Sequence, residues 1–114
     1  NPQLVEGQIE GGFVQGLGLD LVEEMVWDGG RLANPNLMDY KIPGSLDVPY
    51  EINSLIVEHP EPDGPYGAKG VGEIPLVTVP AAISNAIQNA SGARIRTLPM
   101  TSEKVFNSIT ERGS

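Results

Sequence analysis

The amino-acid sequence predicts an α+β fold in which glycine-rich helices pack on a small, mostly antiparallel sheet. Apolar residues recur at helical spacing in three stretches, residues 6–25, 76–90 and 101–109. Short apolar pieces flank an Asp-Gly-Gly turn at residues 25–33, and polar and apolar residues alternate at residues 50–57. The predicted order is helix, hairpin, loop, strand, loop, helix, short strand and helix, without an internal repeat.

Composition limits the chain to one domain at most, because it has 114 residues. Hydrophobic residues make up 39% of the sequence, which is enough to bury a core. The absence of cysteine excludes disulfides, thiolate metal sites, iron–sulfur ligation and cysteine nucleophiles within this chain. A formal charge of −8 argues against nucleic acid and anionic membranes as partners.

Targeting and spanning segments are not evident in the sequence. No apolar run approaches membrane-spanning length, and no basic segment precedes an apolar core, so we predict neither a span nor a signal peptide. We therefore expect a cytoplasmic location. The chain opens with Asn1 and Pro2 rather than methionine, which suggests a piece of a longer polypeptide, a processed product or an artificially shortened chain.

The helix predicted at residues 6–25 carries an apolar stripe that repeats every four residues at Ile9, Phe13, Leu17 and Leu21. Glycines at positions 7, 11, 12, 16 and 18 each weaken a helix by roughly 1 kcal/mol relative to alanine. The usual compensation is close approach of another backbone or of a flat ligand. Gln8 and Gln15 share one face, with Gly11 and Gly12 between them. A tight helix contact flanked by two solvated amides is the alternative interpretation.

The middle of the chain predicts a hairpin, a loop and a strand. Asp28-Gly29-Gly30 is a hairpin signal, and residues 34–49 predict a long ordered loop. Residues 50–57 predict a strand and residues 94–99 a short edge strand. The only histidine, His59, has no second nitrogen or sulfur ligand beside it and is expected at the surface. The last helix, at residues 101–109, is expected to begin with Thr101 as its N-cap. Its apolar side chains Val105, Phe106 and Ile109 are expected to face the interior.

Residues 67–75, Gly-Ala-Lys-Gly-Val-Gly-Glu-Ile-Pro, predict a glycine-rich loop that runs into a helix. The glycines let a backbone approach a ligand closely. Pro75 suits a first helical turn, and Gly92 lies where a C-terminal cap is expected. Glu73 is then expected at the N-terminus of the helix, where the helix dipole favours the ionised carboxylate. Burial would have the opposite effect and raise the pKa of the carboxyl group. Such opposing effects are one way to adjust the pKa of a general base. An ordinary first-turn glutamate is the alternative.

Other catalytic patterns are absent from the sequence. No P-loop, nucleophile-elbow or calcium-loop motif occurs, and residues 67–72 lack the glycine spacing of a dinucleotide loop. A Ser-His-Asp arrangement would have to use His59, with no signature around a serine. Nothing singles out a glycosidase-like pair among the 15 acidic residues.

Four blocks of the sequence, in this order, resemble segments of one enzyme family. Residues 7–18 read Gly-Gln-Ile-Glu-Gly-Gly-Phe-Val-Gln-Gly-Leu-Gly, and residues 40–43 read Tyr-Lys-Ile-Pro. Residues 67–73 read Gly-Ala-Lys-Gly-Val-Gly-Glu, and residues 98–105 read Leu-Pro-Met-Thr-Ser-Glu-Lys-Val. Together they resemble the molybdenum hydroxylases, the xanthine dehydrogenase and aldehyde oxidase family, over essentially the whole chain.

The resemblance implies that residues 1–114 are the C-terminal segment of a molybdopterin-binding domain. In that family, the glutamate matching Glu73 takes the proton from a molybdenum-bound hydroxide, whose oxygen attacks an aldehyde or an N-heterocycle while hydride passes to a sulfido ligand. Gln8 matches the glutamine that hydrogen-bonds the pterin. The backbone of Gly70, Val71 and Gly72 would pass close to the metal ligands, and no side chain of this segment is expected to bind the metal.

The implied cofactor is molybdopterin, as Mo-pterin or its cytosine dinucleotide form, bound jointly with the rest of the enzyme. Iron–sulfur clusters and FAD are expected on other domains or subunits, and the implied partners are those modules, the remaining molybdopterin-binding polypeptide and a small-molecule substrate. The chain alone is expected to be inactive. Lys69 matches a family lysine that we assign to loop structure, and Ile74 and Ser102 depart from the family pattern away from the proposed chemistry. A non-catalytic assembly module is the alternative function.

Overall fold

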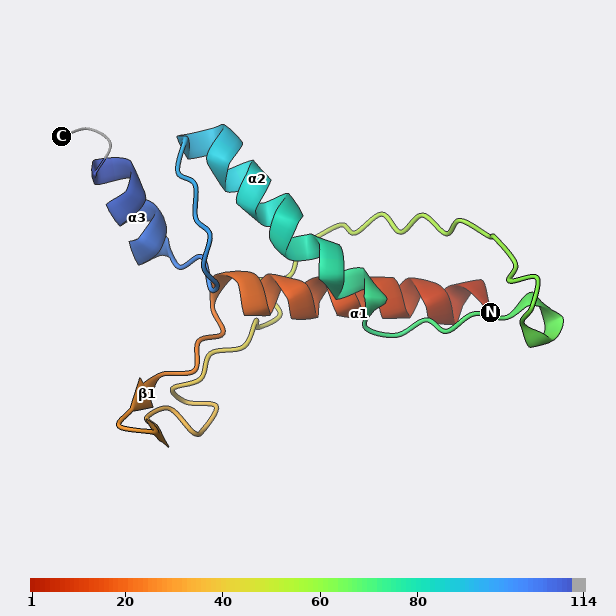
Figure 1. The fold of residues 1–114 in the computed structure, drawn as a ribbon, viewed down its shortest axis with the longest axis horizontal. Coiled ribbons are helices and arrows are strands. Elements are labelled where there is room, and N and C mark those ends of the chain that lie inside the picture. The colour runs from red at the N-terminus through yellow and green to blue at the C-terminus, as the bar shows by residue number, and fades with distance from the viewer. Residues whose placement is uncertain (112–114) are drawn as a thin grey trace.

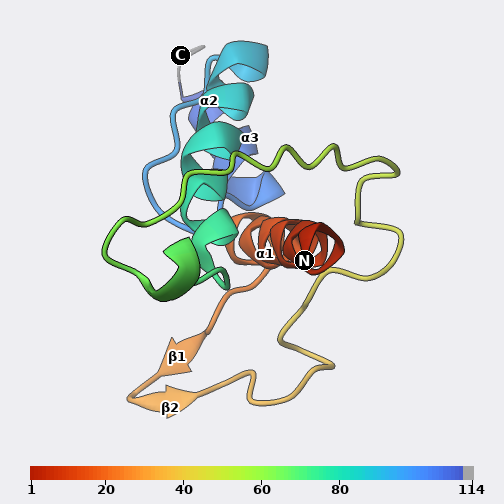
Figure 2. The same cartoon turned by 90° about the vertical axis from the view of Figure 1, so that its right-hand side faces the viewer.

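The computed structural model describes residues 1–111 of the chain. Its elements are, in order, α1 (Pro2–Leu21), β1 (Trp27–Asp28), β2 (Arg31–Leu32), η1 (Pro65–Gly67), η2 (Ile74–Thr78), α2 (Val79–Ser91) and α3 (Ser102–Thr110). The beginning of α2 crosses α1, and the two-stranded hairpin extends from the C-terminal end of α1 (Figures 1 and 2). Helices together with a small antiparallel sheet confirm the predicted α+β class.

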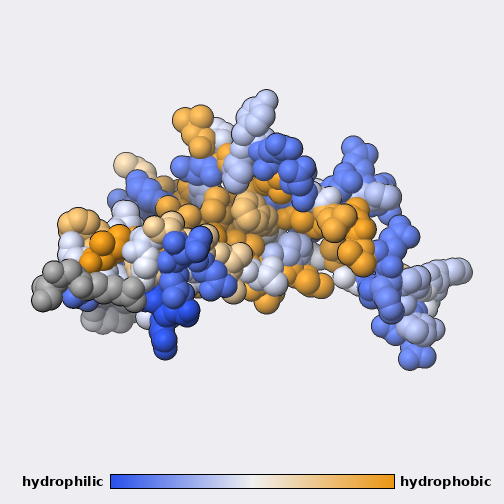
Figure 3. Space-filling model, turned by 90° about the horizontal axis from the view of Figure 1, so that it is seen from above, coloured by the Kyte–Doolittle hydropathy of each residue, from blue (hydrophilic) through white to orange (hydrophobic). Residues whose placement is uncertain are grey.

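The chain is elongated and has almost no apolar interior. Its radius of gyration is 17.6 Å, whereas a compact domain of this length would have about 13 Å. Among the described residues, the buried hydrophobic ones are Val79, Ala93 and Met100. Apolar side chains instead form patches on the surface (Figure 3). The core expected from composition is therefore wrong for this segment, because no element of the segment covers most of its apolar side chains.

Helix α1 begins and ends about four residues earlier than predicted. The Asn1 side chain accepts a hydrogen bond from the Leu4 N–H at 3.4 Å, and Pro2 occupies the first turn, where it loses no hydrogen bond. At the other end, the N–H groups of Val22 and Glu23 both donate to the Gly18 carbonyl. None of the helices formed by residues 1–111 combines the length and hydropathy needed to cross a lipid bilayer.

Two glycines of α1 allow the close crossing of helices that the sequence predicts. A Cβ atom added to Gly12 would lie 2.9 Å from Pro75 Cβ, and one added to Gly16 would lie 2.8 Å from Val79 Cβ. Carbon atoms in favourable contact are about 3.5–4.0 Å apart, so only glycine permits these contacts. The backbone of α1 therefore packs directly on η2 and on the start of α2.

The predicted hairpin is confirmed at β1 and β2, which pair antiparallel with Asp28 opposite Arg31. Gly29 and Gly30 have φ angles of +54° and +83°. A two-residue connection with positive φ at both positions is the type I′ turn that matches the twist of paired strands. Residues 34–49 form the predicted long loop, which contains turns but no helix or strand.

The two other predicted strands are wrong as secondary structure in this segment. Residues 50–57 run as an extended trace, and residues 94–99 connect α2 to α3, but neither pairs with another strand of the described chain (Figure 1). A β-strand needs a neighbouring strand with which its backbone forms hydrogen bonds. Alternation of polar and apolar side chains indicates an extended backbone but does not show that such a neighbour is present. Residues 94–99 are instead fixed near the helices, since Ser84 Oγ donates to the Ile95 carbonyl at 3.3 Å.

Helix α2 ends as predicted and begins with a tighter turn than predicted. Gly92 has a φ of +75°, and its N–H donates to the Gln88 carbonyl at 2.8 Å, which confirms the glycine C-cap. The 3₁₀-helix η2 precedes α2, with Pro75 in its first turn. Glu73 is the residue that precedes this first turn, so the loop that carries it enters η2 directly.

Helix α3 has the predicted cap but not the predicted burial. Thr101 Oγ1 accepts a hydrogen bond from the Lys104 N–H at 3.3 Å. Phe106 is 65% exposed and Ile109 is 43% exposed, so the prediction that they face an interior is wrong within this segment. They line an open apolar hollow of about 510 Å³, together with Leu21, Val22, Ile87, Met100 and Val105.

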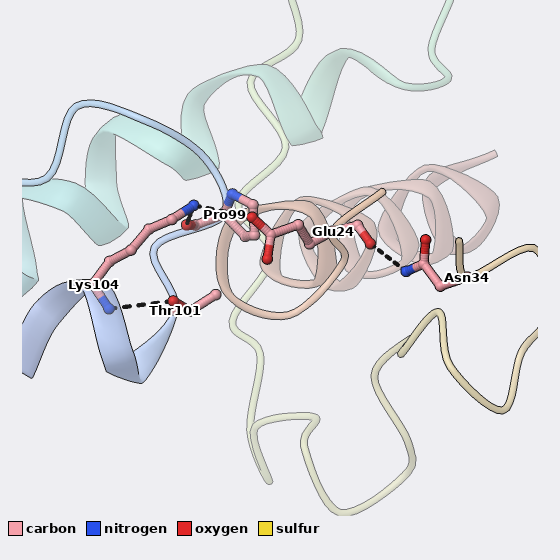
Figure 4. A network of polar contacts seen from close by, with 5 residues as sticks. All are labelled: Glu24, Asn34, Pro99, Thr101 and Lys104. Atoms are coloured by element: carbon pink, nitrogen blue, oxygen red, sulfur yellow. Dashed lines mark hydrogen bonds and ion pairs between the residues drawn. The ribbon is translucent and has the colours of Figure 1, made fainter. Parts of the chain in front are cut away.

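A polar network joins α3, the end of α1 and the hairpin (Figure 4). Lys104 Nζ lies 3.3 Å from Glu24 Oε1 and donates to the Pro99 carbonyl at 2.9 Å. Asn34 accepts from the Val26 N–H at 2.9 Å and donates to the Glu24 carbonyl at 2.6 Å. Because Asn34 is 9% exposed, its two hydrogen bonds are shielded from water and close the base of the hairpin, between Asn34 and the segment that follows α1.

Candidate functional site

Glu73 lies on the glycine-rich loop, directly before η2, and its side chain is exposed. It does not cap the helix, since its side chain accepts no hydrogen bond from η2. The carboxylate is instead held from α1, where Gln15 Nε2 donates to Glu73 Oε1 at 3.3 Å. The loop and α1 thus meet at an ionisable group that is open to a ligand.

Gln15 was not among the predicted site residues, although its position on the face of Gln8 was noted. The contact between Gln15 and Glu73 joins residues that are 58 positions apart. Periodicity indicates that Gln15 and Gln8 share a face but cannot indicate which loop that face meets. The crossing of α1 by η2 brings Gln15 to Glu73, and that crossing depends on the packing at Gly12 and Gly16.

Gly70 and Gly72 border open space beside Glu73. A Cβ added to either residue would meet no heavy atom within 4 Å, and neither residue has a positive φ. Neither packing nor backbone conformation within the described chain therefore requires glycine here. Val71, between them, is 45% exposed. The backbone of this loop is accessible to a group that lies outside the chain.

Gln8 lies on the exposed side of α1, and its side chain makes no hydrogen bond to the rest of the described chain. Two glycines on the same side, Gly7 and Gly11, also have no heavy atom within 4 Å of an added Cβ. At 3.6 residues per turn, Gly7, Gln8, Gly11 and Gln15 occupy one face of the helix. The face is flat, exposed and carries two amides, which can donate and accept hydrogen bonds toward a flat polar ligand.

An apolar groove of about 560 Å³ lies between α1, the loop and residues 55–57. Its walls include side chains of α1 and of η2, namely Val5, Ile9, Phe13, Ile74 and Pro75. Val71 belongs both to the glycine-rich loop and to this groove. The loop that carries Glu73 therefore also contributes, through Val71, to a surface that would favour an apolar group.

A second carboxyl group, that of Asp20, is buried in α1 without a hydrogen-bond partner in the described chain. Burial raises its pKa from 3.8 to about 6, because the charged form loses its hydration. The sequence analysis missed this residue, and its only sequence signal is an acid between apolar residues near the helix end. Asp20 makes no contact with Glu73 or Gln8 and lies outside the surface described above.

Two other residues singled out from the sequence are exposed. His59 lies at the surface, as predicted. Lys69 is exposed, and within residues 1–111 it makes no hydrogen bond or ion pair that would hold the loop. Among these residues, no three histidines or carboxylates lie close enough together to bind a metal ion.

Comparisons with known proteins show which family the chain resembles. Residues 1–49 match a family model described as a molybdopterin cofactor-binding domain. The chain is 46% identical over 108 residues to a putative xanthine dehydrogenase molybdenum-binding subunit of Escherichia coli, covering 93% of this chain and 14% of the relative. It is 41% identical over 109 residues to the aldehyde oxidoreductase of Megalodesulfovibrio gigas, covering 96% of this chain and 12% of that protein.

Solved structures agree with the sequence relatives. The crystal structure of quinoline 2-oxidoreductase from Pseudomonas putida 86 matches with a TM-score of 0.88 and 43% identity, over 97% of this chain and 14% of that one. The Cu,Mo-containing CO dehydrogenase matches with a TM-score of 0.87 and 28% identity, over 99% of this chain and 15% of that one.

The fold and the glycine-lined surface therefore define a segment of a molybdopterin cofactor-binding protein. The chain belongs to the molybdenum hydroxylase family, which includes xanthine dehydrogenases and aldehyde oxidoreductases. It spans about one seventh of the length of the relatives that it matches.

Proposed function

We propose that this chain forms one wall of the active site of a molybdenum hydroxylase, with Glu73 as its general base. The observation that supports this role most directly is the arrangement around Glu73. Its carboxylate is exposed, is held by Gln15 at 3.3 Å and adjoins two glycines that leave open space. A general base must be reachable by the proton it removes and fixed in orientation, and both conditions are met here.

The residues of the same surface fit a flat, polar cofactor. Gln8 offers an amide without an internal partner, and the backbone at Gly70, Val71 and Gly72 is accessible. We assign these residues to molybdopterin binding, jointly with the rest of the enzyme. When bound, the molybdenum cofactor supplies the two-electron redox chemistry. This segment orients the pterin through Gln8 and leaves room for the cofactor beside the loop.

Glu73 acts on the oxygen that enters the substrate. As a carboxylate, it removes the proton from the water-derived nucleophile, so that the oxygen can attack an electrophilic carbon. Gln15 donates to one carboxylate oxygen and leaves the other free to take up that proton. The apolar groove beside the loop would exclude water and receive the body of the substrate.

The substrate class we propose is an aldehyde or an N-heterocycle. This class is supported by the relatives, whose names include a xanthine dehydrogenase, an aldehyde oxidoreductase and a quinoline oxidoreductase. The chain alone should be inactive, because it presents a single wall of the site and an open surface. Activity requires the remaining molybdopterin-binding polypeptide, together with iron–sulfur and flavin modules. The C-terminal position within that polypeptide and the cytoplasmic location stay predictions.

The experiment that tests this function is the substitution Glu73→Gln in the complete enzyme. Glutamine keeps the size and the contact with Gln15 but cannot accept the proton, so kcat should fall by about 10²–10⁴-fold while cofactor content is unchanged. Glu103→Gln is a matched control, because Glu103 is an exposed glutamate in the first turn of α3. If both variants retain full turnover, Glu73 is an ordinary first-turn residue and the segment is an assembly module.

A further inference from the structure

Residues 50–58 form an extended segment with the surface pattern of a β-strand. Ile52, Ser54 and Ile56 are half-buried, while the residues between them are exposed. The trace of this segment zigzags regularly in Figures 1 and 2, where it runs past α1 and α2. Alternation of this kind places successive side chains on opposite faces of a strand.

The backbone of this segment lacks every hydrogen bond that a strand makes. No N–H or C=O group of residues 50–58 is bonded to another backbone group of the described chain. The segments on either side do form such bonds, since the Asp47 N–H donates to the Gly44 carbonyl and the Glu61 N–H donates to the Gly67 carbonyl. Ser54 Oγ is also buried without a partner. Native proteins pair nearly all backbone groups that are shielded from water, so an unpaired extended run with half-buried side chains and a buried, unpaired hydroxyl indicates a missing neighbour.

The side chains of the segment indicate that both of its faces become covered. Leu55, Ile56 and Val57 line the apolar groove against α1. Leu55 is 84% exposed and Val57 is 78% exposed, so much of each apolar surface is open to solvent. Large apolar side chains on a strand with two unpaired edges are typical of a strand inside a sheet, and they are avoided at a free edge.

We propose that residues 50–58 are a strand of a larger β-sheet, and that its neighbouring strand comes from the part of the molybdopterin-binding polypeptide outside these 114 residues. The relatives are about seven times longer than this chain, so a neighbouring strand of the same polypeptide is available at high effective concentration. A strand from a second copy of the chain or from a separate subunit would have to compete for the same edge with the strands of that polypeptide, and it would do so at a lower effective concentration.

Amide hydrogen exchange on the complete enzyme tests this proposal. We expect the amides of residues 50–58 to exchange at least about 100-fold more slowly than those of Ser45 and Leu46 in the same sample, because strand hydrogen bonds protect amides and the N–H groups of these two turn residues make no hydrogen bond within the described chain. Protection at every second residue would indicate one paired edge, and continuous protection would indicate two. Exchange as fast as at Ser45 and Leu46 would overturn the proposal.

The same measurement on the full-length molybdopterin-binding polypeptide, separated from its companion subunits, identifies the source of the neighbouring strand. Protection that persists at all protein concentrations supports a strand of the same polypeptide. Protection that disappears on separation, or on dilution, would overturn the proposal in favour of another subunit or a second copy.

Proline substitution gives a second readout, because proline cannot donate to a neighbouring strand. The N–H groups of Asn53 and Ser54 point to opposite edges, so at least one of Asn53→Pro and Ser54→Pro should speed exchange of the flanking amides about tenfold. Asn53→Ala, which keeps the N–H, should leave exchange unchanged. No effect from either proline would count against strand pairing. This test does not depend on the role of Glu73.

Discussion

Gln15 is expected to support the proposed role of Glu73 by holding its carboxylate in the orientation that accepts a proton. We predict that Gln15→Ala, made in the complete enzyme, lowers kcat by about tenfold and changes KM little. The reason is that the amide orients the group that reacts and does not belong to the apolar groove expected to receive the substrate.

The magnitude follows from the geometry of the contact. Hydrogen bonds to charged groups contribute about 1.5–3 kcal/mol. The distance of 3.3 Å is longer than the common value, and both side chains are exposed in this segment, so we take the lower end. A loss of about 1.4 kcal/mol in transition-state stabilisation corresponds to a tenfold loss in rate.

The assay compares kcat for the wild type, Gln15→Ala, Glu73→Gln and the double variant, at equal molybdenum content. If Gln15 acts through the charge of Glu73, adding Gln15→Ala to Glu73→Gln should lower kcat by less than about twofold. Gln3→Ala is the control, because Gln3 is an exposed glutamine of α1 that has no side-chain hydrogen bond. A full tenfold loss in the Glu73→Gln background would refute the proposed coupling.

Three further predictions concern stability. Gly16→Ala places a Cβ against the branched Val79 side chain, so we expect a loss of about 1–3 kcal/mol and a lower thermal midpoint; an unchanged midpoint would contradict the tight crossing. Asp20 binds its proton up to a pKa of about 6 in the folded chain against 3.8 unfolded, so stability falls as pH rises through that window. Asp20→Asn should therefore gain stability relative to the wild type across the window, by up to about 3 kcal/mol at neutral pH, in unfolding experiments at several pH values. Asn34→Ala should cost about 1–3 kcal/mol and speed amide exchange in the hairpin, because it removes both hydrogen bonds of this nearly buried amide.

Local signals in the sequence predicted local structure well. The glycine cap at Gly92, the Thr101 cap and the hairpin turn at Gly29 and Gly30 each depend on a few neighbouring residues, and each is confirmed. The glycines of α1 correctly predicted close packing, although their partners Pro75 and Val79 were not foreseen. Caps and turns depend on residues that are adjacent in the sequence, so a short motif predicts them. Packing partners are far apart in the sequence, so no short motif identifies them.

Features that depend on distant partners were harder to predict. The alternation at residues 50–57 indicates strand-like side chains, but pairing requires a segment that these residues do not contain. Phe106 and Ile109 have the spacing of buried residues, yet no element of this chain covers them. At the candidate site, Glu73 was singled out from its loop motif together with the family resemblance, and its role stays a prediction. Its contact with Gln15 was missed, because it spans 58 positions and depends on the helix crossing.

The crossing of α1 and η2 also bears on how this enzyme could be re-engineered. The ring of Pro75 packs on Gly12 with no side chain of α1 between them, only two positions after Glu73. Neither glycine nor the proline ring has a flexible side chain that could adjust at this contact, so the position of the proposed base is difficult to change. Catalytic groups must be held to within about 0.5 Å of the productive geometry. Changes of substrate scope should therefore leave this crossing intact and be sought in the side chains that line the apolar groove and in walls supplied by other parts of the polypeptide.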